Sequence, residues 1–183
     1  MQVIGITGRK RHGKDSVARE LVLNGFKIVR FADPLKAMLR AFYQAHDLVP
    51  SEIERRLEGD LKEHPCIYLN GKTPRHAMQT LGTEWGRDLI DQDLWTDSLR
   101  RRASLHDKVV VPDVRFENEC AKIHEMEGKV VRVDASQRVP EDTFSNHSSE
   151  TGIGKLPADL EIDNNGTPFE LQHAVKAVLG FSV

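Results

Sequence analysis

Short apolar runs recur along this chain, and a longer segment of mixed character follows each of them. Residues 3–6 and 109–111 are almost continuously apolar, which is typical of strands buried on both faces of a parallel sheet. Residues 26–31 alternate between apolar and polar side chains and also predict a strand, and residues 129–134 predict a further strand. Residues 158–163 predict a last strand at the edge of the sheet.

Amphipathic segments lie between these strands and predict helices. Residues 14–23 carry apolar side chains three or four positions apart, and Asn24-Gly25 is a typical helix end. A capping residue followed by proline predicts three further helix starts, at Asp33-Pro34, Thr73-Pro74 and Thr167-Pro168. Strands and helices therefore alternate, and the sequence predicts an α/β protein.

A glycine-rich segment joins the first strand to the first helix. Its two glycines let the backbone turn tightly, so that successive N–H groups can form an anion-binding nest. The start of the helix adds unpaired N–H groups, and Lys14 would reach the β- and γ-phosphates of a nucleotide. Strand, glycine-rich turn, lysine and helix together make a P-loop. The predicted phosphate-binding residues are Gly8, Arg9, Lys10, Arg11, His12, Gly13, Lys14, Asp15 and Ser16.

One position of this loop departs from the usual pattern. Asp15 follows Lys14 where serine or threonine is usual, and the hydroxyl comes one residue later at Ser16. The alternative interpretation is a glycine-rich turn that binds nothing. The flanking strand and helix favour the phosphate-binding loop, but they leave the role of Asp15 open.

Asp113 and Arg115 follow three valines that predict a central strand. Both residues fall at the carboxyl end of that strand, next to where the P-loop must lie. An acidic residue there can hold Mg²⁺ through water, and an arginine can bind a phosphate with two hydrogen bonds. The alternative is an Asp–Arg pair at the surface.

A group of polar and aromatic residues follows Thr73-Pro74. Arg75 and Gln79 are four positions apart and share one helix face. Two glycines interrupt the next stretch, close to Thr83, Trp85 and Arg87, and favour a shaped site. A helix break beside a core tryptophan is the alternative.

Three other segments also carry predictions. Asp33 can cap a helix, or it can bind a ligand together with Lys36 near the end of a strand. Asn70-Gly71 predicts a small hairpin over residues 67–72. Residues 135–155 are long and polar, which favours a lid, with Arg138 as its best phosphate-seeking residue.

Composition narrows the classes of function. The chain has 183 residues, with 26 basic and 28 acidic side chains and a net charge of −2, so neither general nucleic-acid binding nor membrane binding is expected. No apolar run is long enough to cross a bilayer, and Met1 leads directly into a strand with no signal peptide, which predicts a cytoplasmic protein. Cys66 and Cys120 lack convincing metal-ligand spacing and are interpreted as structural or surface residues.

Four motifs resemble the deoxynucleoside monophosphate kinases of tailed bacteriophages, and the resemblance covers nearly the whole chain. The motifs are residues 8–16, Arg75-x-x-x-Gln79-x-x-Gly82-Thr83, Val111-Pro112-Asp113-x-Arg115 and Asp163-Asn164-Asn165-Gly166-Thr167. The loop and the Pro-Asp-x-Arg strand end are the most specific. The same parts, with His147-x-x-Glu150, are similar to animal-type phosphomevalonate kinase. The wider class of nucleoside monophosphate kinases often places the loop hydroxyl as Ser16 is placed.

The resemblance implies a three-layer P-loop kinase fold, with a mostly parallel central sheet flanked by helices. It implies a single domain over residues 1–183. Its core comprises residues 1–32, 106–134 and 156–183, its helical acceptor-binding region residues 33–105, and its lid residues 135–155.

The resemblance also implies ATP-dependent, Mg²⁺-assisted phosphorylation of a deoxynucleoside monophosphate. In that reaction Lys14, Arg115 and Arg138 would be catalytic, and Ser16, Asp15 and Asp113 would hold the metal ion. Location in the host cytoplasm would follow if the chain is phage-encoded, and whether it forms a homodimer stays open. The implied acceptor-binding residues are Asp33, Lys36, Arg75, Gln79, Thr83, Trp85, Arg87 and Glu150.

Two alternatives remain at this point. The first is a P-loop kinase of another small phosphorylated acceptor, such as phosphomevalonate or dephospho-coenzyme A. The second is a nucleotide-binding switch that passes no phosphate to a small molecule. Three arginines at positions 75, 115 and 138 argue against a switch, which has less need of several arginines inside its site.

Overall fold

The computed structural model describes residues 1–139 and 155–180. Within these residues five strands form one sheet, and every pair of neighbouring strands is parallel. The order across the sheet is β2-β3-β1-β4-β5. The strands are β1 (Gln2–Thr7), β2 (Lys27–Ile28), β3 (Lys108–Val111), β4 (Lys129–Asp134) and β5 (Leu160–Asp163). The predicted α/β fold with a parallel central sheet is therefore confirmed.

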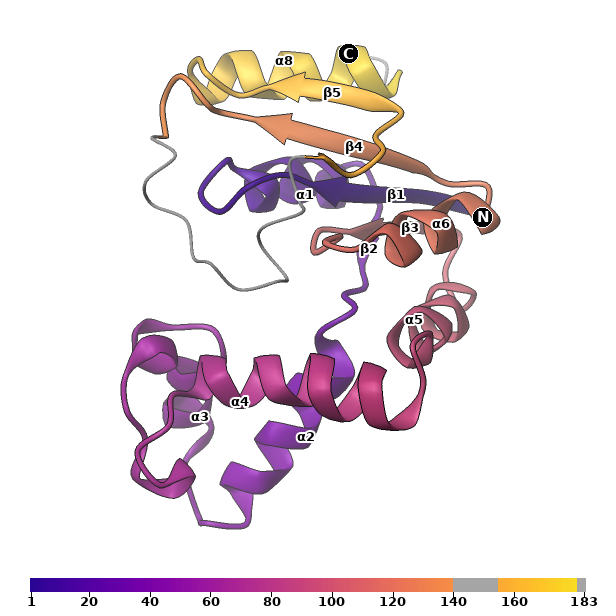
Figure 1. Ribbon diagram of the computed structural model, residues 1–183. Helices are drawn as coiled ribbons and strands as arrows, with labels where there is room; N and C mark the ends of the chain where they lie inside the picture. The colour runs from indigo at the N-terminus through magenta and orange to yellow at the C-terminus, as the bar shows by residue number, and fades with distance from the viewer. Residues whose placement is uncertain (140–154, 181–183) are drawn as a thin grey trace. The chain divides into compact units, whose positions relative to one another are not determined.

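Helices occupy most of the remaining described chain (Figure 1). Two short 3₁₀ helices, η1 (Asp60–Glu63) and η2 (Ile67–Leu69), precede a π-helix, η3 (Leu81–Ile90). The α-helices are α1 (Lys14–Leu23), α2 (Asp33–Gln44), α3 (Pro50–Leu57), α4 (Pro74–Thr80), α5 (Leu94–Ala103), α6 (Glu117–Glu125) and α8 (Pro168–Leu179).

The parallel register brings the carboxyl ends of the central strands to one edge of the sheet. Gly5 of β1 pairs with Val111 of β3 and with Val130 of β4. Just beyond β3, the Val114 N–H donates to the carbonyl oxygen of Ile6 at 3.2 Å. The segments that leave β1, β3 and β4 therefore start side by side, which is where open α/β sheets bind ligands.

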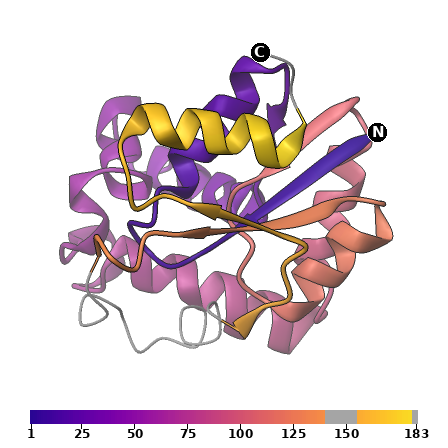
Figure 2. The ribbon, with the colours of Figure 1, turned by 90° about the horizontal axis from the view of Figure 1, so that it is seen from above.

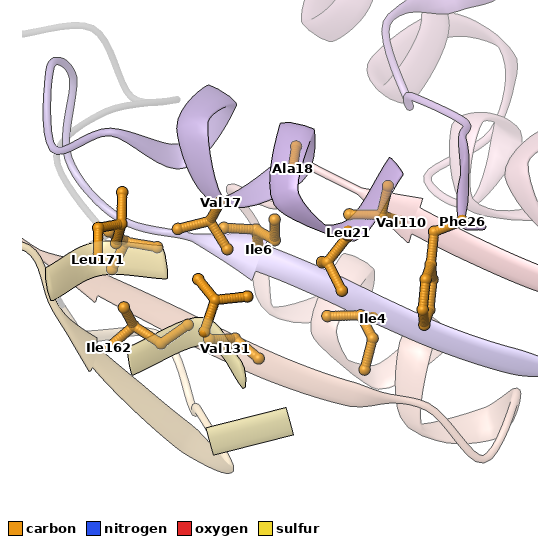
Figure 3. Packing of buried hydrophobic residues seen from close by; sticks show 12 residues of the cluster. Ile4, Ile6, Val17, Ala18, Leu21, Phe26, Val110, Val131, Ile162 and Leu171 are labelled. Atoms are coloured by element: carbon orange, nitrogen blue, oxygen red, sulfur yellow. The ribbon is translucent and has the colours of Figure 1, made fainter. Parts of the chain in front are cut away.

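One face of the sheet packs against α1 and α8. Ile4 and Ile6 of β1 belong to one cluster of buried apolar side chains that includes residues of both helices (Figure 3). The cluster also includes Leu21 of α1 and Leu171 of α8. Helix α8 lies beside β5, the edge strand (Figures 1 and 2).

Gly5, between these two isoleucines, points to the opposite face, because successive strand residues alternate. A Cβ at Gly5 would lie 3.1 Å from the side chains of Ile123 and Val114. Helix α6 therefore packs closely against the second face, and the sheet has helices on both sides.

The described chain divides into two compact units. The sheet unit contains Met1–Phe31 and the described residues from Thr96 onward, and the helical unit contains Ala32–Trp95. Most of α5 belongs to the sheet unit, although the predicted helical region extended to residue 105. This part of α5 belongs to the sheet unit because its side chains contact that unit. The ammonium group of Lys122 in α6 lies 3.3 Å from the carboxylate of Asp97, and the Arg102 guanidinium donates to the Arg30 carbonyl oxygen at 2.7 Å.

Three local predictions need correction, the first of them only in the length of the strand. The strand predicted over residues 26–31 is regular only at Lys27–Ile28, although the Val29 N–H still donates to Val110 at 3.0 Å. The hairpin predicted over 67–72 is η2 followed by Asn70 in the left-handed conformation, because the segment closes on itself: the Gly71 N–H donates to the Cys66 carbonyl oxygen.

The third correction concerns the cap, one of the two roles considered for Asp33, because Asp33 is instead the first residue of α2. Ala32 occupies the cap position in a helical conformation, and no side chain caps the helix there.

The two cysteines fit a structural role: both are free and buried, and burial raises the pKa of the Cys120 thiol to about 11. In residues 1–139 and 155–180, every helix is too short or too polar for a membrane span.

Candidate active site

The phosphate loop leaves the carboxyl end of β1 and leads into α1. Its glycines at positions 8 and 13 have φ angles of 140° and 92°, in a region that few other residues adopt. A Cβ at Gly8 would lie 2.5 Å from the carbonyl oxygen of Val133, so the loop turns directly against the end of β4. Arg11 also has a positive φ, of 65°. This backbone is curled as an anion-binding nest requires.

Lys14 lies over the start of this loop. Its ammonium group donates to the carbonyl oxygens of Gly8 and Arg9, at 2.6 and 2.8 Å. These contacts keep a half-buried positive charge beside the loop N–H groups. Asp15 and Ser16 follow in the first turn of α1, and both are exposed.

His12 is the one residue of the predicted loop whose side chain is buried away from solvent. Its ring is 2% exposed, and its Nδ1 accepts a hydrogen bond from the N–H of Ala135 at 3.0 Å. The imidazole therefore packs against the segment after β4. Only the backbone of His12 remains as a candidate for phosphate binding.

Asp113 and Arg115 lie just beyond β3, on the same edge of the sheet as the loop. The Asp113 carboxylate accepts from the N–H of Phe31 at 3.0 Å and so ties the end of β3 to the segment after β2. The Arg115 N–H donates to Glu119, a buried carboxylate at the start of α6, at 2.6 Å. Exposed Arg138 belongs to a turn after β4, in which its N–H donates to Ala135 at 3.0 Å.

The remaining described candidates lie in the helical unit, where α4 continues into η3. The indole N–H of Trp95 donates to the Gly82 carbonyl oxygen at 2.7 Å, and a Cβ at Gly86 would lie 2.5 Å from the same indole. Gly86 therefore makes room for the Trp95 indole, Gly82 accepts its hydrogen bond through the backbone, and the helix continues past both glycines. π-Helical turns are frequent at functional sites.

The core tryptophan of this region is Trp95, at 4% exposure, whereas Trp85 is 36% exposed. The two rings lie 6.2 Å apart between centroids. Gln79 and Thr83 are half-buried on α4 and η3. Arg87 is 9% exposed and donates to the Gln92 carbonyl oxygen at 3.4 Å, so it is held inside the helical unit.

Two of the predicted acceptor-binding cations form ion pairs with carboxylates that sequence reasoning did not single out. Lys36 lies 2.6 Å from Glu58, and Arg75 pairs with Glu63. Glu58 lies just before η1, and Glu63 is the last residue of η1. An anionic ligand at Lys36 or Arg75 would compete with these two carboxylates.

The site residues thus divide between the two units. The loop, Asp113, Arg115 and Arg138 belong to the sheet unit, and the acceptor-binding candidates from Asp33 to Arg87 belong to the helical unit. Glu150 and most of the predicted lid lie outside the described residues. Within the part of the chain that the structure describes, three or more His, Cys, Asp or Glu side chains nowhere gather as a ready metal cluster.

Comparison with known proteins identifies the family of this chain. The sequence profile of the deoxynucleotide monophosphate kinase family matches residues 67–175, more than half of the chain. The chain belongs to the deoxynucleotide monophosphate kinase family. This confirms the family that the four sequence motifs predicted.

Two relatives agree with this assignment. A protein of Acanthamoeba polyphaga mimivirus, named as a deoxynucleotide monophosphate kinase, is 31% identical over 91% of this chain and 90% of its own length. The deoxynucleoside-5'-monophosphate kinase of Escherichia phage T5 is 35% identical over 44% of this chain and 35% of its own length. Among solved structures, TT1252 from Thermus thermophilus shares the fold, with a TM-score of 0.51, 18% identity and coverage of 99% of this chain and 97% of that one.

The geometry of the loop leads to a prediction about Gly13. Gly13→Ala would place a Cβ 2.1 Å from the side-chain amide of Asn164, whereas the matched change Gly25→Ala enters open space at a similar φ of 86°. Left-handed backbone strain should lower the free energy of unfolding by about 1–2 kcal/mol in both variants, and the overlap with Asn164 should lower it further in Gly13→Ala. Only Gly13→Ala should also weaken ADP binding, by about tenfold or more, in calorimetric titration. Equal ADP affinity in the two variants would contradict the assignment of this loop.

Proposed function

We propose that this chain transfers the γ-phosphate of ATP to a deoxynucleoside monophosphate, giving ADP and the deoxynucleoside diphosphate. The observation that carries the proposal is the phosphate loop. A left-handed glycine turn and a lysine lie at the carboxyl edge of a parallel sheet, in a chain of the deoxynucleotide monophosphate kinase family. The names of both viral relatives support this substrate class.

The sheet unit would bind the donor. The curled backbone from Gly8 to Gly13 offers N–H groups to the phosphates, and Lys14 is already beside them. Mg²⁺ bound to ATP keeps several waters and needs few protein ligands. Exposed Ser16 and Asp15 in the first turn of α1, with half-buried Asp113 after β3, supply the oxygen atoms that this ion prefers. Bound there, the ion would neutralise charge on the phosphates.

The helical unit would bind the acceptor. Arg75 and Lys36 would exchange their carboxylate partners for the phosphate of the deoxynucleoside monophosphate, which is a stronger anion than either glutamate. Trp85 presents a partly exposed indole on which a base can stack. Asp33, Gln79 and Thr83 would give further polar contacts, whereas buried Arg87 would support η3 from within.

The reaction needs positioning and charge stabilisation more than a covalent catalyst. An oxygen of the acceptor's phosphate attacks the γ-phosphorus, and the bond from that phosphorus to the β–γ bridging oxygen breaks. Negative charge grows on the transferring group and on the departing ADP. Lys14, together with Arg115 and Arg138, would stabilise this charge, and the exclusion of water would prevent hydrolysis of ATP.

The formation of a homodimer and a location in the host cytoplasm stay predictions.

An acceptor panel tests the proposal against a kinase of another small phosphate ester. ADP release would be measured with Mg-ATP and, in turn, the four common deoxynucleoside monophosphates, phosphomevalonate and dephospho-coenzyme A. At least one deoxynucleoside monophosphate should stimulate ADP release well above the rate without acceptor. Stimulation by only one of the other two esters would reassign the substrate, and tight ATP binding without any stimulation would favour a nucleotide switch.

The role of Lys14 makes a second prediction. Lys14→Ala should lower kcat by about 10²–10³ because it removes a charge aimed at the transferring phosphate. Lys129→Ala is the matched control, since Lys129 is exposed at the opposite, amino end of β4. Its kcat should equal that of the wild type in the same coupled assay. A Lys14→Ala enzyme with wild-type turnover would refute the assignment of the loop.

The role of Trp85 makes a third prediction. Trp85→Ala should raise the KM for the acceptor about tenfold, because stacking of a base on an aromatic side chain is worth roughly 1–3 kcal/mol. The KM for ATP should change little. Leu89→Ala, at a residue 76% exposed in the same helix, is the control and should leave both constants unchanged. An equal rise in both KM values for Trp85→Ala would instead mean general damage to the helical unit.

A further inference from the structure

Two buried polar side chains, His12 of the loop itself and Asn164 from just after β5, tie the phosphate loop to distant parts of the sequence. Asn164, just after β5, is 5% exposed, and its side-chain N–H donates to the carbonyl oxygen of His12 at 2.8 Å. The His12 ring, 2% exposed, accepts in turn from the N–H of Ala135, just after β4. The loop is thereby tied to the ends of two strands other than the one it leaves.

The hydrogen bond from the Ala135 N–H determines which nitrogen of the His12 ring carries the proton. Because the Ala135 N–H can only donate, Nδ1 must be the unprotonated ring nitrogen, and the proton of the neutral ring is on Nε2. Burial lowers the pKa of His12, although the neighbouring Asp134 carboxylate works in the other direction. Both the hydrogen bond from Ala135 and burial favour the neutral ring, in which Nδ1 stays available as the acceptor.

Asn164 is itself fixed in place. Its backbone N–H donates to the carbonyl oxygen of Asp134, the last residue of β4, at 2.7 Å. Its side-chain amide fills the space beside Gly13, where a Cβ would lie 2.1 Å from Nδ2. The amide thus lies against His12 and Gly13, the two residues that precede α1. If this amide moved, the loop N–H groups would move with it.

We infer that Asn164 is a positioning residue of the phosphate loop: its amide, working with the His12 ring, fixes the direction in which the loop N–H groups and Lys14 face a bound phosphate. The inference deepens the proposed function, on which it rests for the identity of that phosphate as part of ATP or ADP. The sequence motif at residues 163–167 would thereby have a role at the donor site. Asn164 would act only by positioning the loop, since it contacts the loop backbone and not the ligand.

Asn164→Ala tests the inference, with Asn24→Ala as the matched control. Asn24 also donates from its side-chain amide to a backbone carbonyl oxygen, that of Glu20 at 2.8 Å, but at the far end of α1. Each change removes one amide-to-carbonyl hydrogen bond. Both variants should therefore unfold at somewhat lower denaturant concentration than the wild type.

Only Asn164→Ala should change the donor site. Its Kd for Mg-ADP by calorimetry and its KM for ATP should both rise about tenfold, as expected when a buried carbonyl loses its partner. The KM for the acceptor should stay within about twofold of the wild type. Wild-type Kd for ADP in Asn164→Ala, with only the unfolding midpoint changed, would overturn the inference.

A pair of variants at His12 tests the same arrangement from the other side, and it applies even if Asn164→Ala does not fold. In His12→Asn the amide oxygen can take the place of Nδ1 as acceptor for Ala135, whereas His12→Leu offers no acceptor. ADP affinity should be largely kept in His12→Asn and lost about tenfold in His12→Leu. Equal affinities in the two variants would contradict the inference.

The two proposals can fail separately. Intact ADP binding by the wild type without phosphorylation of any deoxynucleoside monophosphate would refute the proposed function alone, because the loop measurements need no acceptor. No ADP binding by the wild type would refute both.

Discussion

Two close contacts between the phosphate loop and the ends of β4 and β5 leave no room for a Cβ in the loop's glycines. Gly8 turns against the Val133 carbonyl oxygen, and Gly13 lies against the Asn164 amide. Both contacts depend on the sheet, because the parallel register of the strands sets where β4 and β5 end. The apolar cluster under α1 and α8 holds that register, so the core that stabilises the fold also shapes the anion nest.

Much of the sheet unit could be predicted from local sequence. Apolar runs marked the strands, and a strand followed by glycines, lysine and a helix has few other structural solutions. The position of Asp113 and Arg115 also followed from general topology, because parallel strands end at one edge. These signals are local or depend on chain direction, which the sequence displays directly. The family assignment, carried by the same motifs, agrees with them.

What the sequence did not reveal depends on partners far along the chain. Asn164 meets His12 across more than 150 residues, and only the folded sheet brings them together. The two glycines of η3 predicted either a shaped site or a helix break, because the sequence does not show that Gly86 makes room for the indole of Trp95 in the next helix. The partners of Lys36 and Arg75 were hidden for the same reason, since any of several acidic residues could have paired with them.

The most direct measurement of the central claim follows the phosphate itself. The protein would be mixed with ATP labelled in the γ-phosphate, Mg²⁺ and a deoxynucleoside monophosphate, and the labelled products would be separated. The account predicts that the label appears in the deoxynucleoside diphosphate. Label that appears only as inorganic phosphate, or stays in ATP with every deoxynucleoside monophosphate, would contradict it.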